Sequence, residues 1–113
     1  MELAAVRHFE NRNYCYALEK GRFLVRLETK RGDITKVRLH TKEKYLPGGL
    51  SRQTHDMALA CRDRYRDYYE TVITIDMVCL RYFFEVEDAS GQVLYYGDHG
   101  FCERPIEDVG QMF

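Results

Sequence analysis

The stretch from Leu80 to Phe101 constrains the fold most, because it predicts a β-hairpin. Its first half alternates two sets of side chains with a period of two, which places one set on each face of a strand. The first set is Leu80, Tyr82, Phe84 and Val86, and the second is Arg81, Phe83, Glu85 and Glu87. A turn-forming run ending at Gly91 follows, and then a second β-rich run over residues 92–96. We interpret the first run as the central strand of the core.

The rest of the chain predicts further short strands, separated by turns at spacings of about ten residues. They cover residues 4–9, 14–18, 22–30, 34–40, 54–61 and 68–75, with one helical turn open as an alternative for 54–61. Phe23, Val25 and Leu27 share one face of the third, and the change of phase between Ile34 and Val37 indicates a β-bulge. This pattern predicts an all-β chain, an immunoglobulin-like antiparallel β-sandwich of about seven or eight strands.

The domain organisation follows from length and from the loss of periodicity near the C-terminus. A chain of 113 residues accommodates one domain. Residues 1–103 carry the strand pattern, whereas 104–113, with Pro105 and Gly110, show no period and are predicted to be a linker. The four cysteines are expected to be reduced, with a disulfide between two strands as the open alternative. They are Cys15, Cys61, Cys79 and Cys102.

Composition excludes several classes of function. Seventeen basic residues nearly balance eighteen acidic ones, for a net charge of −1. The sequence has no stripe of basic residues, so no nucleic-acid partner is expected. No apolar run approaches the ~20 residues of a membrane span, so no membrane partner is expected. The first residues lack the basic-then-apolar layout of a signal peptide, which predicts a cytoplasmic location.

No constellation of side chains indicates catalysis or a cofactor. His99 and Cys102 are close in sequence, but no third group orients them as a nucleophile and its base. Asp98 and His99 have no second pair at metal-ligand spacing. A calcium site made of loop carboxylates is conceivable, but the sequence does not specify one. We therefore predict no catalytic residue, no metal ligand and no cofactor.

The aromatic residues are more informative about binding, because a Tyr ring offers an apolar face and a hydroxyl group. Most of the nine Tyr and six Phe residues are expected in the core. Tyr45 differs, since it lies outside any periodic pattern, between a Lys-Glu-Lys run and a Pro-Gly-Gly turn. Phe83 is predicted to face away from the core side of its strand. For such a ring, a contact with a ligand or partner and a plain solvated or edge-packed position are both open.

Several segments, in their order and spacing, resemble one known family. They are residues 5–8, 13–17, 24–34, 44–45, 67–69, 80–84 and 95–101. In them the chain resembles the N-terminal domain of the cyclomaltodextrinase, neopullulanase and maltogenic amylase group of the α-amylase superfamily, also called carbohydrate-binding module family 34. Two departures from the family pattern are the Thr-Lys-Glu run at 41–43 and the absence of Trp.

The resemblance implies a non-catalytic domain that precedes a (β/α)₈ barrel, which is absent here and acts on cyclodextrins, pullulan or maltooligosaccharides. It implies dimers in which this domain of one subunit shapes the active-site cleft of the other. Tyr45, with Lys44 beside it, would then touch the bound sugar. The implied partners are a maltooligosaccharide or cyclodextrin and the catalytic barrels of the same chain and of a partner subunit. The alternative is a purely structural or dimerisation domain without independent sugar binding.

Overall fold

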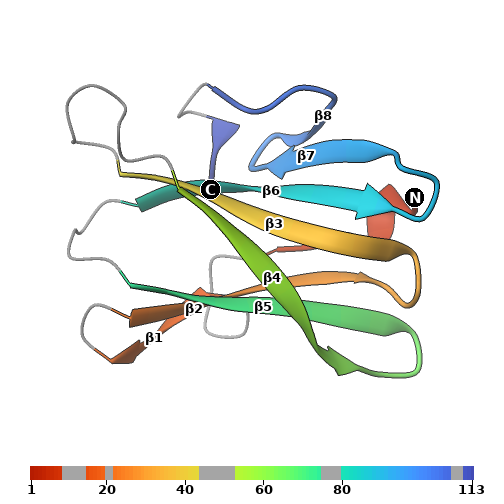
Figure 1. The fold of residues 1–113 in the computed structure, drawn as a ribbon, viewed down its shortest axis with the longest axis horizontal. Helices are drawn as coiled ribbons and strands as arrows, with labels where there is room; N and C mark the ends of the chain where they lie inside the picture. Colours follow the sequence, from red (N-terminus) through yellow and green to blue (C-terminus); the bar gives the residue numbers. More distant parts are fainter. Residues whose placement is uncertain (9–14, 20–21, 44–52, 75–79, 108–110) are drawn as a thin grey trace.

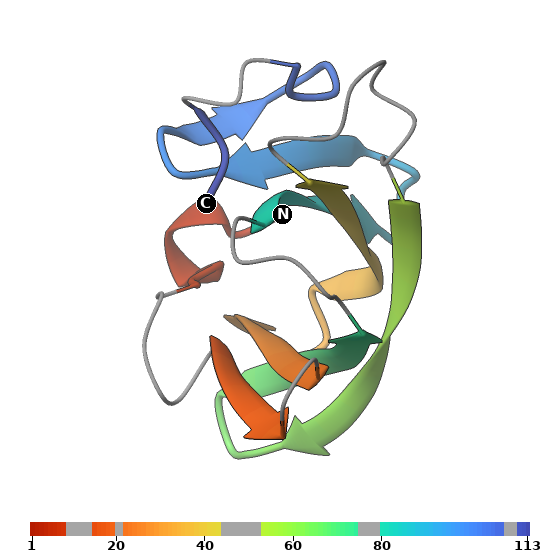
Figure 2. The same cartoon turned by 90° about the vertical axis from the view of Figure 1, so that its left-hand side faces the viewer.

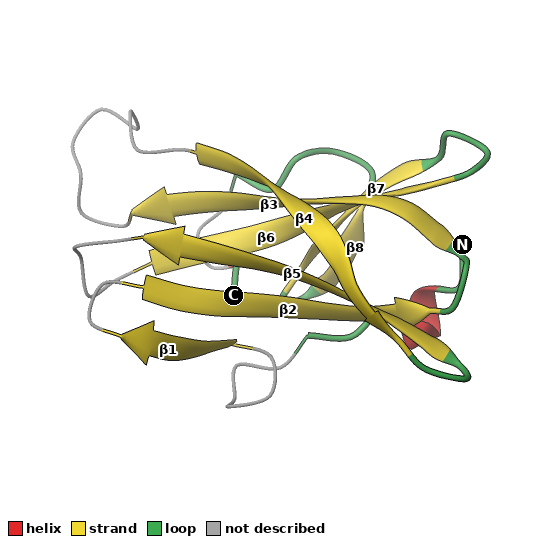
Figure 3. Ribbon diagram, turned by 60° about the horizontal axis from the view of Figure 1, so that its bottom comes forward, coloured by secondary structure: helices red, strands yellow, loops and turns green. Residues whose placement is uncertain are grey.

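The computed structural model describes residues 1–8, 15–19, 22–43, 53–74, 80–107 and 111–113, and these form an all-β, immunoglobulin-like sandwich (Figures 1 and 3). Eight strands pair antiparallel in the order β1-β2-β5-β4-β3-β6-β7-β8. Their bounds are β1 Cys15–Glu19, β2 Arg22–Lys30, β3 Ile34–Glu43, β4 Gln53–Arg62, β5 Arg66–Thr74, β6 Leu80–Asp88, β7 Val93–Gly97 and β8 Gly100–Cys102. A single 3₁₀ turn, η1 (Leu3–Ala5), precedes them. Among the described residues no helix has the length and hydropathy to cross a membrane.

Strand β4 joins the two layers of the sandwich. Its first half pairs with β3, ending at the pair Val37–Met57, and its second half pairs with β5, beginning at Ala58–Glu70. The lower layer therefore contains β1, β2, β5 and the end of β4, and the upper layer contains the start of β4 with β3, β6, β7 and β8. Figures 1 and 2 show β4, in green, crossing from one layer to the other along one side. One continuous strand thus closes that side.

The core lies between the layers and uses the predicted face of β6. Phe84 and Val86 are fully buried and Tyr82 is nearly so, opposite Val25 and Leu27 of β2. Phe23 packs against this cluster while remaining partly exposed, and the side chain of Leu80 lies outside the description. Arg81 and Glu85 lie on the other face and are partly exposed. The predicted register of the central strand is confirmed.

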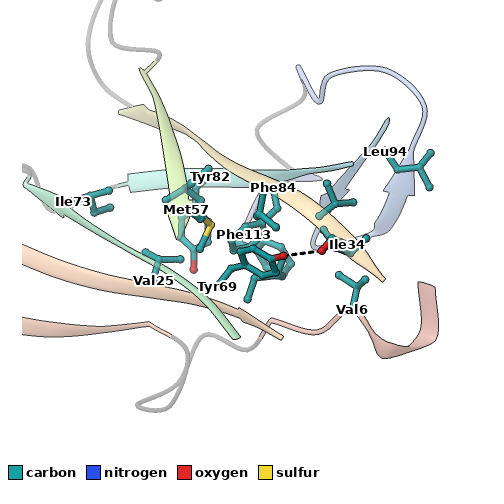
Figure 4. Packing of buried hydrophobic residues seen from close by; sticks show 14 residues of the cluster. Val6, Val25, Ile34, Met57, Tyr69, Ile73, Tyr82, Phe84, Leu94 and Phe113 are labelled. Carbon is teal, nitrogen blue, oxygen red and sulfur yellow. Dashed lines mark hydrogen bonds between the residues drawn. The ribbon is translucent and has the colours of Figure 1, made fainter. Parts of the chain in front are cut away.

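Tyr69 satisfies a main-chain acceptor that the departure of β4 would leave without a partner. On the N-terminal side of Val37, β3 no longer pairs with β4, so that ladder gives the Ile34 carbonyl no partner. The Tyr69 hydroxyl donates to that carbonyl over 2.7 Å (Figure 4). Burial raises the pKa of Tyr69, which keeps the hydroxyl a donor. A buried carbonyl needs such a partner, and this bond therefore holds the two layers together where β4 crosses.

The two chain ends close the opposite side, and each adds one residue to a sheet. Arg7 exchanges both main-chain hydrogen bonds with Glu28, beyond the point where β1 stops pairing with β2. Phe113 exchanges both with Tyr82, beyond the point where β7 stops pairing with β6. His8 lies buried between the two ends. Figure 2 shows the N-terminal segment and the C-terminus on the side away from β4.

Most sequence-predicted strands are present, and the differences concern the chain ends. The bulge near Ile34, the turn with positive φ at Gly91 and strand β4 are confirmed. The predicted strand at 4–9 is wrong over its first residues, which form η1; among the described residues 4–8, Arg7 alone pairs with a strand. Strand β8 was not predicted. In the predicted linker 104–113, Ile106 and Phe113 are buried, while the domain boundary itself stays a prediction.

Candidate functional site

Lys44 and Tyr45, the residues predicted to contact sugar, lie outside the described residues. They follow directly after Glu43, the last residue of β3. The end of β3 is paired on both sides, with β4 through Thr41–Gln53 and with β6 through Lys42–Arg81. The nearest described residues in the sequence therefore belong to the end of β3, so we consider the outer face that β3 shares with β4 and β6.

That face carries a connected set of polar side chains, which we call the outer-face network. Its members are Arg38, His40, Thr54, Asp56 and Glu85. Arg38 is opposite Glu85 on β6 and opposite Asp56 on β4 in the strand register. It binds both carboxylates, with 3.4 Å between its Nε and Asp56 Oδ1. The hydrogen bond to Glu85 raises the pKa of Arg38. Opposite charges on directly paired residues stabilise the register of neighbouring strands.

His40 connects a hydroxyl group to a carboxylate within this network. Its Nε2 lies 3.1 Å from Glu85 Oε1, and its Nδ1 lies 3.2 Å from Thr54 Oγ1. In the neutral ring, Nε2–H donates to the carboxylate and Nδ1 accepts from the hydroxyl. A hydroxyl, an imidazole and a carboxylate in this order occur in nucleophilic catalysis. Here Arg38 shares the carboxylate and Thr54 is exposed on a strand surface, so the geometry fits a cross-strand network better than a reaction centre.

Phe83 is on the outer face, as predicted, but it is not available to a ligand. Its side chain is only 1% exposed, because Ile106 and Met112 of the C-terminal segment pack over it. The ring of His40 stacks on it at a centroid distance of 4.8 Å and an interplanar angle of 8°. Of the two alternatives left open for this outward ring, the packed position is the one observed, because a distant part of the chain covers it.

Among the described Phe and Tyr side chains, Tyr65 is the most exposed to solvent. It is 68% exposed in the turn between β4 and β5, and the Arg64 guanidinium lies 5.4 Å from the centre of its ring. The Asp63 carboxylate accepts hydrogen bonds from the main-chain N–H groups of Tyr65 and Arg66, at 2.8 and 2.7 Å. These bonds lower the pKa of Asp63. No sequence pattern singled out Tyr65. Its carbonyl accepts from the Arg31 N–H over 3.0 Å, so it lies beside the turn that precedes β3, at the opposite end of that strand from Glu43.

Two buried carboxylates hold this turn in place. Asp67 is fully buried and accepts from Arg62 over 2.5 and 2.9 Å, and from the Gly32 N–H over 2.9 Å. The bond from Arg62 is the main cause that lowers the pKa of Asp67. Glu28 is 4% exposed and pairs with Arg66. Because each carboxylate has a basic partner, this cluster acts as a structural tie between two turns.

The described residues show no group of three metal-ligating side chains. Cys61 and Cys102 carry free thiols, while the side chains of Cys15 and Cys79 lie outside the description. The calcium alternative and the pairing of those two cysteines therefore stay predictions. Sequence reasoning also missed the outer-face network, because its pairs become visible only when the strand order is known.

Comparison with known proteins decides the family. The family model described as "Alpha amylase, N-terminal ig-like domain" matches residues 1–113, the whole chain. The chain belongs to this family. Neopullulanase 2 of Thermoactinomyces vulgaris is 27% identical over 113 residues, and the cyclomaltodextrinase of Geobacillus thermopakistaniensis (strain MAS1) is 30% identical over 116 residues. These matches cover 98% and 100% of this chain but only 19% and 20% of the relatives.

A solved structure supports the same fold for this Ig-like domain. A cyclomaltodextrinase superposes with a TM-score of 0.92 at 24% identity, over 100% of this chain and 19% of that one. The Ig-like domain thus spans about a fifth of the length of its relatives, at the N-terminal position that the family description states. The predicted family membership is confirmed, and the named relatives are hydrolases.

Proposed function

We propose that the Ig-like domain is the non-catalytic carbohydrate-binding part of an α-glucan or cyclodextrin hydrolase, and that it shapes the active-site cleft of a partner subunit. The observation that supports this most is the match of the entire chain to a domain found at the N-terminus of such hydrolases. Catalysis would belong to a barrel in the same protein, because glycoside hydrolysis uses two positioned carboxyl groups on a substrate cleft.

Tyr45 and Lys44 are the proposed sugar contacts. They follow β3, a strand fixed on both sides by ladder hydrogen bonds, so the base of their connection is rigid. A Tyr ring placed against the C–H face of a glucose unit gains roughly 25 cal/mol for each Å² of apolar surface removed from water. One such contact with a few hydrogen bonds corresponds to a Kd of about 1 mM for the domain alone.

The second candidate is a structural or dimerisation domain. The outer-face network supports it, because its charged groups are paired with one another and do not need a ligand to balance them. In this alternative, the domain supports the barrel and sugar contacts are incidental.

A pair of matched variants separates the two candidates. Tyr45→Ala in the parent hydrolase should raise KM for a cyclodextrin, whereas Tyr65→Ala, which removes an exposed Tyr from another turn, should not. In the 113-residue chain, an NMR titration with maltohexaose should show weak binding that Tyr45→Ala abolishes and Tyr65→Ala retains. Equal kcat/KM for both variants and the unmodified hydrolase would favour the structural alternative.

A further inference from the structure

We propose that residues 111–113 form a docking strand that fixes the direction in which the chain leaves the sandwich. Gly97 and Phe113 are then positioning residues for the segment that follows in the parent hydrolase. This inference rests on the proposed function only where it concerns the hydrolase. In this proposal, the connection between the domain and the segment that follows it is rigid, whereas a linker without docking would be flexible.

The main chain of this segment is hydrogen-bonded as part of the upper layer. Phe113 N–H donates to the Tyr82 carbonyl over 2.9 Å, and Tyr82 N–H donates to the Phe113 carbonyl over 3.3 Å. The Asp98 N–H donates to the Gln111 carbonyl over 2.9 Å, at the residue where β7 has ended. Residues 111–113 therefore occupy the place beside β6 that β7 leaves empty.

The side chains of the segment alternate as those of a strand do. Met112 is 4% exposed and packs with Phe83 and Ile106 on the outside of the layer. Phe113 is 7% exposed and packs on the inside, with ring centroids 4.8 Å from His8 and 5.7 Å from Tyr82. Two consecutive side chains are thus buried on opposite faces, which anchors the segment against both translation and rotation.

Gly97 leaves the space that residues 106 and 111 of this part of the chain occupy beside β7. A Cβ atom at Gly97 would lie 2.3 Å from the Gln111 carbonyl oxygen and 2.7 Å from Ile106 Cδ1. The first of these is a main-chain atom, which cannot move aside without breaking the hydrogen bond from Asp98. The absence of a side chain at Gly97 therefore sets how closely the segment approaches β7.

The docking strand is connected across the sheet to the strand that precedes the proposed sugar contacts. Tyr82 pairs with Phe113 on one side and with Thr41 of β3 on the other. The exit of the chain and the end of β3 are therefore neighbours of the same strand, β6. A rigid exit fixes the end of β3 relative to the segment that follows Phe113, which a flexible linker would leave free.

The first test measures the order of the segment in the 113-residue chain by ¹⁵N relaxation. The main-chain order parameters of Met112 and Phe113 should be near ~0.85, like those of β6, whereas values below ~0.6 would overturn the proposal. Gly97→Ala should release the segment and lower these values. The matched control is Gly91→Ala, which strains a turn at φ 88° but would bring its Cβ within 4 Å of no heavy atom outside its two chain neighbours. If Gly97→Ala leaves the segment as ordered as the control does, its role as a positioning residue is refuted.

The second test uses the parent hydrolase. Two glycines inserted after Phe113 should raise KM for a cyclodextrin roughly tenfold with kcat nearly unchanged, because they add freedom only to the junction. An ordered segment with an unchanged KM would refute the positioning role. A mobile segment would overturn the docking strand whatever the kinetics, while an inert Tyr45→Ala would overturn the proposed function whatever the order parameters.

Discussion

The two sides of the sandwich are closed by different means. On one side, β4 runs from the upper to the lower layer as a single strand, and main-chain ladders with β3 and β5 hold it. On the other side, two chain ends meet around one buried imidazole. His8 Nδ1–H donates to the Arg26 carbonyl over 2.8 Å, and its Nε2 accepts from the Tyr82 hydroxyl over 2.7 Å. On the first side the main chain itself joins the two layers. On the second side each chain end pairs with one layer through the main chain, and side chains around His8 join the layers.

This difference makes one side sensitive to pH and to changes at the chain ends. His8 is 4% exposed and contacts Tyr82, Phe84 and Phe113, which we call the His8 cage. Burial lowers the pKa of His8 from 6.5 to about 4. The ring is thus neutral near pH 7, consistent with one nitrogen that donates and one that accepts. Protonation would place a charge among aromatic rings.

Removal of residues 104–113 should produce the largest effect. It deletes Ile106, Met112 and Phe113 from the two buried clusters, and loss of a single buried Phe already costs roughly 3–5 kcal/mol. We expect a loss of about 5 kcal/mol or more in the free energy of unfolding, which most domains of this size cannot sustain. Urea unfolding followed by circular dichroism measures it. An unchanged midpoint would show that the chain end is dispensable.

Single substitutions on the two sides should differ in their dependence on pH. Phe113→Ala should cost roughly 3–5 kcal/mol, and Met57→Ala, where β4 changes layers, roughly 2–5 kcal/mol. Only Phe113→Ala opens the His8 cage to water. The free energy of unfolding of this variant should therefore depend less on pH between 6.5 and 4 than that of Met57→Ala. Parallel pH profiles for the two variants would remove the distinction between the sides.

Acid alone should destabilise the domain through His8. Because the folded-state pKa lies below the unfolded value, the unfolded chain binds a proton first, and stability falls as the pH drops from 6.5 to about 4. The full shift corresponds to about 3 kcal/mol. Asp67 and Asp88 also have lowered pKa values, but their contributions are lost only below about pH 4. His8→Gln should be less stable near pH 7 and flatter between pH 6.5 and 4, as free energies of unfolding at each pH would show.

Asp67→Asn should have a moderate effect on the β4 side. The change keeps the shape of the side chain but removes the charge that binds Arg62, where hydrogen bonds to charged groups contribute roughly 1.5–3 kcal/mol. The expected loss of stability is of that size and independent of pH between 5 and 7. A pH-dependent loss in that range would place Asp67 in the same titrating unit as His8.

Tyr65→Ala should have the smallest effect, within about 0.5 kcal/mol, because the ring is largely exposed and its turn is held by Asp63. Thermal unfolding measures it. A clear loss of stability would show that Arg64 and Tyr65 brace the turn, and would disqualify this variant as the control for Tyr45→Ala.

The sequence predicted what depends on period-two burial and missed what depends on distant contacts. The alternation at Tyr82, Phe84 and Val86 identified the core strand, since each face of a strand meets one environment. Gly97 showed no sign of its role, because its close neighbours come from a segment without periodicity. His8 fell in a predicted strand, whereas the described residues 4–8 form a 3₁₀ turn and a single bridge at Arg7.

The candidate site followed a similar division. Resemblance supplied Lys44 and Tyr45, which lie outside the described residues and stay predictions. Period two placed Arg38 and His40 on one face of β3, but it did not show that Glu85 and Thr54 lie beside them. Such cross-strand partners can be predicted only when the strand order is known. The length of the connection between β3 and β4 does not indicate which of their residues pair.

The pKa of His8, measured by NMR titration of its ring carbon protons, tests the central claim most directly. If the chain ends close one side of the sandwich around a neutral, buried imidazole, the value should lie near 4, and Phe113→Ala should raise it toward 6.5. A value near 6.5 in the unmodified chain, unaffected by Phe113→Ala, would show that His8 is open to water and that the two ends do not close that side.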